Sequence, residues 1–454
     1  MTTEYENRIE EEDDLSFGDI VWGQFKKNKV AYSSLWLLGI LLLIAICTPL
    51  FASGRPFYWS EDGVTTYPWF SSLFDRNYYE NGVDIFFNLL LVLGLPLFGI
   101  FLFRVRQVKA TGLRKRPRRK QLGREGSILL GFFFIVFVGI LAKPYQQPYV
   151  QFHDTYLEYE LASDIEAVKT ALATQKEDSK KLTDEQKELI TTVKRLSLEP
   201  DELKQEGDLS AMFAPIPYAF RKTGFPALQK QSWKHWIGVD SAGRDVAVQM
   251  LYGIRISLSI GVIAVGIYVT IGIIIGALAG YFAGVVDMLV QRVIEIVMSV
   301  PVLIVLLVLI AFIEKPSIYH IMLIIGLFRW TGVARLVRGE FYRLRNLDFV
   351  TSAVALGYKP RRIIFQHILP NALGPVLVAA TFGVAGAILT ESGLSFLGFG
   401  DVSVPSWGQT LKDGYDSSTW HLILAPGFAI FATVSILNLV GEGLRDALDP
   451  KMRK

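Results

Sequence analysis

The chain has 454 residues but a single cysteine, Cys47, which lies within an apolar run. One thiol excludes an intrachain disulfide framework and a cysteine-based zinc site. The histidines are few and lack the short pair spacings that chelate a metal on a helix; they are His153, His235, His320, His367 and His421. The phosphate-cradling pattern Gly-x-x-x-x-Gly-Lys-Ser/Thr is also missing. We therefore expect this chain to hold no metal and no cofactor, and to have no catalytic residues.

The sequence also lacks a strong charge imbalance, with 46 Lys and Arg against 43 Asp and Glu. Its basic residues stand in blocks between apolar segments, a pattern typical of membrane orientation and not of nucleic-acid binding. The first twenty residues are acidic, which is the opposite of a signal-peptide start, and Lys26, Lys27 and Lys29 precede the first apolar segment. That segment is predicted to be an uncleaved span whose N-terminal side faces the cytoplasm.

Long apolar runs are abundant, and 51% of the residues are hydrophobic. A membrane-crossing helix needs about 20 mostly apolar residues. The sequence therefore predicts an all-α polytopic membrane protein with eight transmembrane helices, three in the N-terminal part and five after residue 255. The predicted spans are 32–52, 84–103, 126–143, 257–281, 293–313, 318–338, 372–390 and 422–441.

The placement of Lys and Arg gives the expected orientation. Ten basic residues lie in 104–125, against only Arg55 and Arg76 in 53–83. The basic segment is therefore predicted to be cytoplasmic and to lie against anionic lipid, and a nucleic-acid interface there is the less common alternative. By alternation, the expected regions are a cytoplasmic segment 1–30, three spans within 31–143, an extracytoplasmic region 144–255 and a cytoplasmic tail 446–454. Both termini are then cytoplasmic.

The extracytoplasmic region contains a charged stretch, 151–210, without an apolar run. Helical patterns near 156–172 and 184–196, the second with a capping box at Thr183 and Gln186, predict a solvated helical insert. A docking lid is the alternative interpretation.

Four glycines spaced by four residues fall on one face of the predicted span 257–281 and its continuation: Gly272, Gly276, Gly280 and Gly284. Small residues allow close approach of a second helix. Helix packing is the favoured interpretation, and a contact with a translocation pathway is the alternative.

The segment 348–370 predicts a helix, a turn and a second helix. Gly357 can take the positive φ that ends a helix, and Pro360 suits the first turn of the next one. The second helix has an apolar face on which a partner protein could bind. Its members are Ile363, Ile364, His367 and Ile368.

This segment resembles the coupling motif of bacterial ABC-importer permeases, which begins Glu-Ala-Ala and continues after three residues with Gly. The matching positions are Thr351, Ser352, Ala353 and Gly357, so the acidic first residue is absent here. In that family a short helix of the motif lodges in a cleft of the ATPase subunit. The resemblance implies ATPase-coupling roles for six residues: Ala353, Gly357, Ile363, Ile364, His367 and Pro370.

Further segments are similar to permeases that import peptides and nickel. They are 237–245, 252–258, 391–408 and 438–450, and residues 25–63 are similar to permeases of the microcin C type. Such permeases usually have six spans, so the spans predicted within 84–143 are a departure. The resemblance implies an ABC type I importer core at 256–445, with peptides favoured over nickel because no cluster of metal ligands is present.

The same resemblance implies the partners and the location. They are two ATPase subunits that carry ATP and Mg, a second homologous permease, an extracytoplasmic substrate-binding protein and the lipid of the bacterial inner membrane, without nucleic acid. Ion-coupled secondary transport is the competing class, and an intramembrane enzyme is a distant third because no constellation of reactive side chains is visible.

Charged residues near the spans give the last candidates. Arg329 falls within the predicted span 318–338, where an arginine usually faces protein or a water-filled cavity, so it is a candidate pathway or gating residue. Glu391, at the outer end of a span, is the second. Arg292 and Glu295 are predicted to pair at i, i+3, near Asp287.

Overall fold

A computed structural model describes residues 17–61, 64–76, 78–110, 115–142, 209–223 and 225–449. The predicted helical insert at 151–210 lies outside these residues, apart from its last two positions. The described chain forms two compact units. Unit 1 comprises residues 1–42, 256–412 and 423–454, and unit 2 comprises 43–255 and 413–422.

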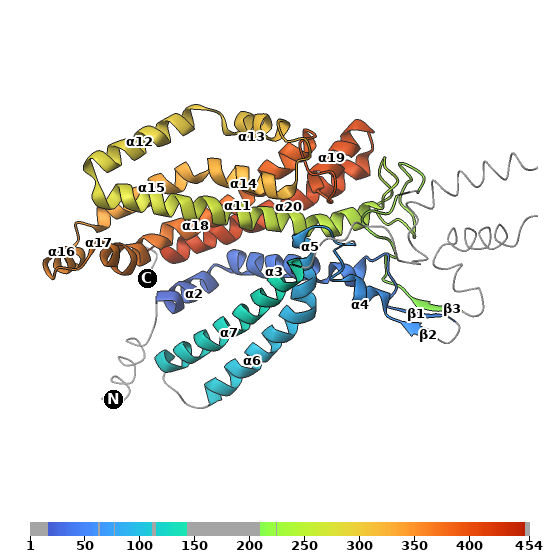
Figure 1. Ribbon diagram of the computed structural model, residues 1–454, viewed down its shortest axis with the longest axis horizontal. Coiled ribbons are helices and arrows are strands. Elements are labelled where there is room, and N and C mark those ends of the chain that lie inside the picture. The colour runs from blue at the N-terminus through green and yellow to red at the C-terminus, as the bar shows by residue number, and fades with distance from the viewer. Residues whose placement is uncertain are drawn as a thin grey trace, which may run out of the picture. The chain divides into compact units, whose positions relative to one another are not determined.

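Unit 2 contains a helical hairpin and a small sheet (Figure 1). The hairpin is formed by α5 (Gly82–Leu89), a π-helical turn η1 (Leu90–Gly94), α6 (Leu95–Ala110) and α7 (Lys115–Leu141). The sheet has the order β2-β1-β3, with β1 (Tyr58–Glu61) antiparallel to β2 (Val64–Thr66) and to β3 (Leu209–Met212). The short helix α4 (Pro68–Ser72) follows β2.

Aromatic side chains dominate the core of unit 2. Tyr79 stacks on Phe220 and on Tyr252 with ring centroids 6.3 and 6.4 Å apart, and Ile85 and Val248 are buried beside them. Offset aromatic stacking adds to the free energy gained by burying the rings. The core therefore joins the segment before α5, the segment after β3 and the start of α11.

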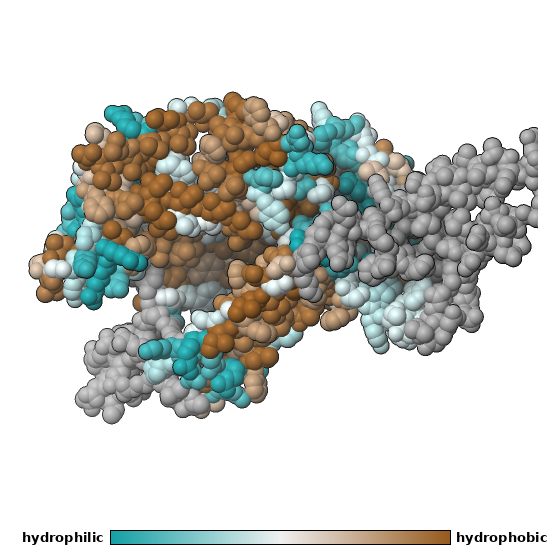
Figure 2. Space-filling model, in the orientation of Figure 1, coloured by the Kyte–Doolittle hydropathy of each residue, from teal (hydrophilic) through white to brown (hydrophobic). Residues whose placement is uncertain are grey.

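Most of unit 1 consists of long helices. Four of the helices, α3, α11, α19 and α20, also extend into unit 2. The helices are α2 (Phe17–Lys27), α3 (Lys29–Phe51), α11 (Val246–Phe282), α12 (Gly284–Ser299), α13 (Val302–Ala311), α14 (Ile318–Phe328), α15 (Trp330–Leu344), α16 (Asp348–Ala355), α17 (Pro360–Arg362), a π-helical turn η3 (Ile363–Ile368), α18 (Leu369–Phe396), α19 (Trp407–Asp416) and α20 (Trp420–Leu448). Figure 2 shows hydrophobic residues over α11, α12 and α13, and hydrophilic residues at the end formed by α16 and α17.

The described residues contain seven helical stretches long and apolar enough to cross a membrane, or eight if a bent pair counts as one span. The seven are 29–51, 82–110, 120–141, 246–282, 318–344, 360–396 and 420–448. The prediction of an all-α polytopic membrane protein is confirmed. The small sheet was not expected.

The predicted span 293–313 is not one straight helix. Helices α12 and α13 meet at an angle of 73° across Val300 and Pro301. Proline has no N–H to donate and pushes the preceding residue into an extended conformation, and Val300 has φ −103° and ψ 129°. The proline therefore divides the apolar run into two helices.

Candidate functional site

The predicted coupling turn is present and has a well-defined backbone. Gly357, with φ +75°, follows the end of α16. The Tyr358 N–H donates to the Ala353 carbonyl at 3.1 Å, and the Gly357 N–H donates to the Val354 carbonyl at 2.9 Å. These two bonds form a Schellman motif, which requires a left-handed residue and explains the glycine.

The helix after the turn begins at Pro360, as the sequence indicates. Lys359 is extended, with φ −64° and ψ 145°, and Pro360 occupies the first turn of α17. From there η3 and α18 continue the helix to Phe396 without a gap. A displacement of the turn is therefore applied directly to one end of a long helix.

The prediction that a partner binds the face of Ile363, Ile364, His367 and Ile368 is wrong for the isoleucines. All three are buried inside unit 1, where η3 packs against α16. His367 is half-buried and its ring stacks on that of Tyr358, with centroids 5.8 Å apart. Helical periodicity identifies an apolar face, but it does not say whether the chain itself covers that face.

Other side chains at the turn are exposed and apolar. Leu356 has 72% of its surface exposed, and Phe349 and Val354 of α16 and Phe365 of η3 are also exposed. Ala353 is buried, whereas the predicted coupling residues Gly357 and Pro370 are exposed. The surface available to a partner is therefore the outer side of the turn, which the sequence reasoning missed because these residues lie on two elements, α16 with its C-terminal turn and η3.

Three of the four aligned glycines lie directly against α15. A Cβ atom added at Gly272 would lie 2.6 Å from the Cβ of Val333, and one at Gly276 would lie 2.5 Å from the Ala334 carbonyl oxygen. One at Gly280 would lie 2.6 Å from the Cβ of Phe341. Helices α11 and α15 therefore approach at distances that only glycine permits.

Gly284 departs from the prediction that it packs on the same face. Helix α11 ends at Phe282, and Ala283 and Gly284 both have positive φ, at 52° and 55°. A Cβ added at Gly284 would meet nothing within 4 Å. Gly284 therefore starts α12 in a new direction, which the four-residue spacing could not reveal.

Arg329 lies at the junction between α14 and α15, not within an uninterrupted helix. Its backbone has φ −95° and ψ 0°, and its side chain is half-buried. The guanidinium reaches α18, because a Cβ added at Gly386 would lie 2.9 Å from its Nη1 atom. The glycine thus makes room for the charged group between two segments of unit 1.

Glu391 is 2% exposed. Its carboxylate accepts hydrogen bonds from the hydroxyls of Ser395 and Ser406, both at 2.7 Å, and from that of Ser392 at 3.4 Å. Ser406 lies beyond the end of α18, at the close of the following loop. The structure therefore assigns Glu391 to holding this loop on the helix.

Two long-range polar contacts in unit 1 were not expected from the sequence. The Asp401 carboxylate accepts a hydrogen bond from the backbone N–H of Ile318 at 3.0 Å, at the start of α14. Asp287 of α12 forms an ion pair with Arg338 of α15, with Nη2 and Oδ2 2.6 Å apart. The predicted Arg292–Glu295 pair is also present, at 2.7 Å.

In unit 2, the segment before α11 is organised by buried polar groups. His235 lies 2.8 Å from Asp245, its ring stacks on that of Tyr218, and Asp240 binds the Arg244 side chain at 2.7 Å. Burial raises the pKa of the Asp245 carboxyl above its ordinary value, against the opposing effect of the His235 hydrogen bond. Among the residues that the structure describes, no three His, Cys, Asp or Glu side chains are grouped to hold a metal ion.

A turn with exposed apolar side chains thus adjoins closely packed helices that are long and apolar enough to cross a membrane. Two family models match the chain. The model described as the binding-protein-dependent transport system inner membrane component matches residues 272–454. The model described as the N-terminal TM domain of oligopeptide transport permease C matches residues 16–68.

Curated relatives agree with these matches. The oligopeptide transport system permease protein OppC of Bacillus subtilis (strain 168) is 39% identical over 253 residues, which cover 54% of this chain and 82% of that protein. The OppC protein of Haemophilus influenzae is 44% identical over 223 residues, 48% of this chain and 71% of that protein. A structure of the MetNI methionine ABC transporter in inward-facing conformations is 17% identical, with a TM-score of 0.38, and covers 44% of this chain and 96% of its own.

The chain belongs to the family of binding-protein-dependent transport system inner membrane components, and it is a permease subunit of an ABC importer. It is a transport subunit and not an enzyme. The family predicted from the coupling motif and the associated segments is confirmed.

Proposed function

We propose that this chain forms half of a translocation pathway for peptides in a bacterial inner membrane, with both termini in the cytoplasm. Its partners are two ATPase subunits that bind ATP and Mg, a second permease and an extracytoplasmic binding protein. The printed names of the relatives, oligopeptide and dipeptide permeases, support a peptide as cargo.

The observation that carries the proposal is the exposed coupling turn. Leu356, which follows α16, and Phe365, which lies in η3, present exposed apolar side chains at this turn. Exposed apolar side chains with polar neighbours are typical of a protein-binding surface. The basic residues Lys359, Arg361 and Arg362 provide these neighbours. An ATPase subunit is the partner that we assign to this surface.

Transmission follows from the packing behind the turn. Because α16 is packed on η3 through buried Val350, Ala353 and Ile363, the two helices move together. The movement passes along α18 to Gly386, where Arg329 lies, and to Glu391, which holds the next loop. ATP-driven closure of the partner would thus reach both the α14–α15 junction and the far end of α18.

The turn at Gly357 provides the test. Proline cannot adopt the positive φ of this residue, so Gly357→Pro should destroy the Schellman motif and detach the partner surface. We expect ATP hydrolysis without uptake, with normal membrane insertion. Gly357→Asn is the matched control, because asparagine tolerates this conformation and should retain most uptake.

Uptake of a labelled peptide and phosphate release are measured in vesicles that contain the complete importer. Equal uptake by Gly357→Pro and the unsubstituted protein would show that this turn does not couple hydrolysis to transport.

A further inference from the structure

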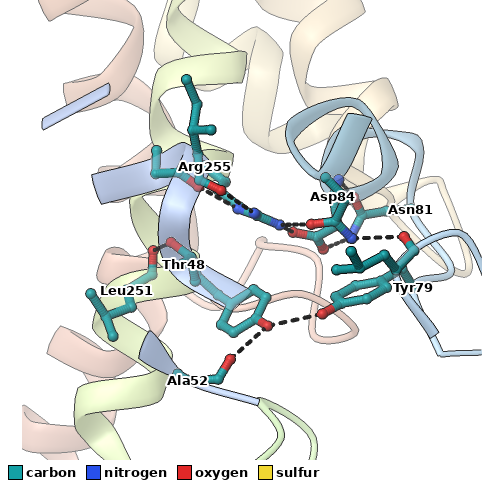
Figure 3. A network of polar contacts seen from close by, with 12 residues as sticks. Thr48, Ala52, Tyr79, Asn81, Asp84, Leu251 and Arg255 are labelled. Atoms are coloured by element: carbon teal, nitrogen blue, oxygen red, sulfur yellow. Dashed lines mark hydrogen bonds and ion pairs between the residues drawn. The ribbon is translucent and has the colours of Figure 1, made fainter. Parts of the chain in front are cut away.

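Arg255 of α11 is completely buried, and each nitrogen of its guanidinium group donates a hydrogen bond to an acceptor in unit 2 (Figure 3). Its Nε donates to the Ala45 carbonyl at 2.7 Å, and its Nη2 donates to the Ile46 carbonyl at 3.3 Å. Its Nη1 donates to the Asp84 carboxylate at 3.1 Å and to the Asn88 side-chain oxygen at 2.9 Å. One side chain therefore joins α3, α5 and α11.

The acceptor on α3 is available because of a proline. Pro49 lies inside α3 and has no N–H, so the Ala45 carbonyl four residues earlier has no donor within the helix. A carbonyl left unpaired inside a membrane protein is destabilising, because no water replaces the lost hydrogen bond. Arg255 supplies the missing hydrogen bond.

The acceptors on α5 are held in place by their own contacts. Asn81 caps α5 by accepting from the Asp84 N–H at 2.8 Å, and it donates to the Asp84 carboxylate at 2.7 Å. Asn88 donates to the Leu73 carbonyl at 2.8 Å. Both acceptors are thus oriented toward Arg255 before it binds them, which lowers the entropy lost in forming the contacts.

Aromatic side chains complete the site. The guanidinium lies 5.3 Å from the Phe87 ring centroid and 5.4 Å from that of Tyr252. The Tyr252 hydroxyl donates to the Ala52 carbonyl and lies 3.1 Å from the Tyr79 hydroxyl (Figure 3). The rings cover the charge with their negative faces, and cation–π contacts of this kind are strongest when desolvated.

Apolar packing holds α5 and the end of α7, where Ile85 and Phe137 contact the aromatic core, but it contributes little along the rest of the hairpin of α5, η1, α6 and α7. Only 6% of the apolar window of α7 is buried, and 22% of that of the stretch 82–110. Lipid is as apolar as leucine, so such surface gives helices no hydrophobic reason to associate, and polar contacts decide instead. A second polar contact lies at the end of α7, where Arg76 donates to the Leu141 carbonyl at 3.0 Å.

We propose that Arg255 is a positioning residue that fastens this hairpin to α3 and α11 through a four-acceptor junction. The junction holds the end of the hairpin at which α5 starts and α7 ends. The hairpin is then fixed to the parts of α3 and α11 that belong to unit 2. This inference concerns unit 2 and does not depend on the cargo.

If Arg255 and Asp84 formed only a simple ion pair, substitutions at these positions would have different effects from those expected for the four-acceptor junction. Exchanging the two residues preserves an ion pair, but an aspartate at 255 cannot donate to the Ala45 and Ile46 carbonyls. A lysine at 255 keeps the charge but loses the planar fork of donors. The double variant D84R/R255D and the single variant Arg255→Lys therefore separate the two accounts.

The test is amide hydrogen exchange on the full chain in lipid nanodiscs, followed by mass spectrometry. In Arg255→Lys and in D84R/R255D we expect exchange roughly tenfold faster in 45–52 and 82–89, as loss of about 1.4 kcal/mol implies, with 318–344 unchanged. Asp84→Asn keeps an acceptor oxygen and should show a smaller increase in the same segments. It also gives a readout if a stronger variant does not fold.

Arg104→Met is the matched control. It removes an arginine of the same hairpin whose ion pair with Glu125 is solvent-exposed, with the Arg104 side chain 45% exposed. Exchange in 45–52 and 82–89 should then match the unsubstituted chain. Unchanged exchange in Arg255→Lys, or full rescue by D84R/R255D, would overturn the proposal.

Discussion

At the residue scale, Arg255 and Glu391 are buried polar side chains whose partners include groups from other segments of the chain. Glu391 accepts three hydroxyl hydrogen bonds, and one of their donors, Ser406, lies fifteen residues away on the following loop. A buried carboxylate costs free energy unless such donors surround it. Glu391 therefore joins α18 to the loop between α18 and α19.

Glu391→Ala should lower the thermal unfolding temperature in detergent. It leaves the hydroxyls of Ser395 and Ser406 without their acceptor, which costs about 1–3 kcal/mol for each buried group left unpaired. Glu391→Gln keeps one acceptor oxygen and should be less destabilising. If the alanine variant unfolds at the same temperature as the unsubstituted chain, Glu391 does not anchor the loop.

Residues such as Gly357 were predictable because the reason for them is local. A glycine three residues before a proline specifies a turn between helices, and both the positive φ and the helix start are found. The partners of Arg255 were not predictable, since Asp84 lies 171 residues away. Sequence patterns predict the local conformation of adjacent residues far better than they predict contacts between residues that are distant in the sequence.

At the element scale, glycines govern how closely helices pack. Gly276 lets α11 approach the backbone of α15 at Ala334, and in a membrane such close contact stabilises helix association. Gly266 of the same helix faces open space, because a Cβ added there meets nothing within 4 Å. The two positions form a matched pair.

Gly276→Leu should destabilise the detergent-solubilised protein, because the larger side chain must push α15 away, at about 1–3 kcal/mol or more. Gly266→Leu should leave the unfolding temperature nearly unchanged. Thermal unfolding followed by intrinsic fluorescence measures both. Equal effects of the two substitutions would mean that the glycine face does not determine the α11–α15 contact.

Hydrophobic periodicity did not predict where a helix bends or whether an apolar helix face is buried. The apolar run 293–313 has the length of a span, yet Pro301 bends it by 73° between α12 and α13. The apolar face of η3 was identified correctly, but α16 covers its isoleucines. Length and period specify an amphipathic helix, whereas its neighbours decide what it contacts.

At the scale of the whole molecule, the segments that resemble importer permeases were predictable from the sequence, whereas the attachment of the additional hairpin was not. The segments that resemble importer permeases predicted the family, which the relatives confirm. The hairpin 82–141 had no counterpart in that resemblance, so its attachment through Arg255 emerged only from the structure. The family resemblance thus predicts the shared core, but it does not predict how an added element such as the hairpin is attached.

The central claim is that ATP drives a peptide through this permease. The most direct measurement is uptake of a labelled oligopeptide into proteoliposomes containing the purified importer and its binding protein, with ATP and ion gradients varied independently. The account predicts uptake that requires ATP and continues when all ion gradients are dissipated. Uptake driven by an ion gradient in the absence of ATP would contradict it.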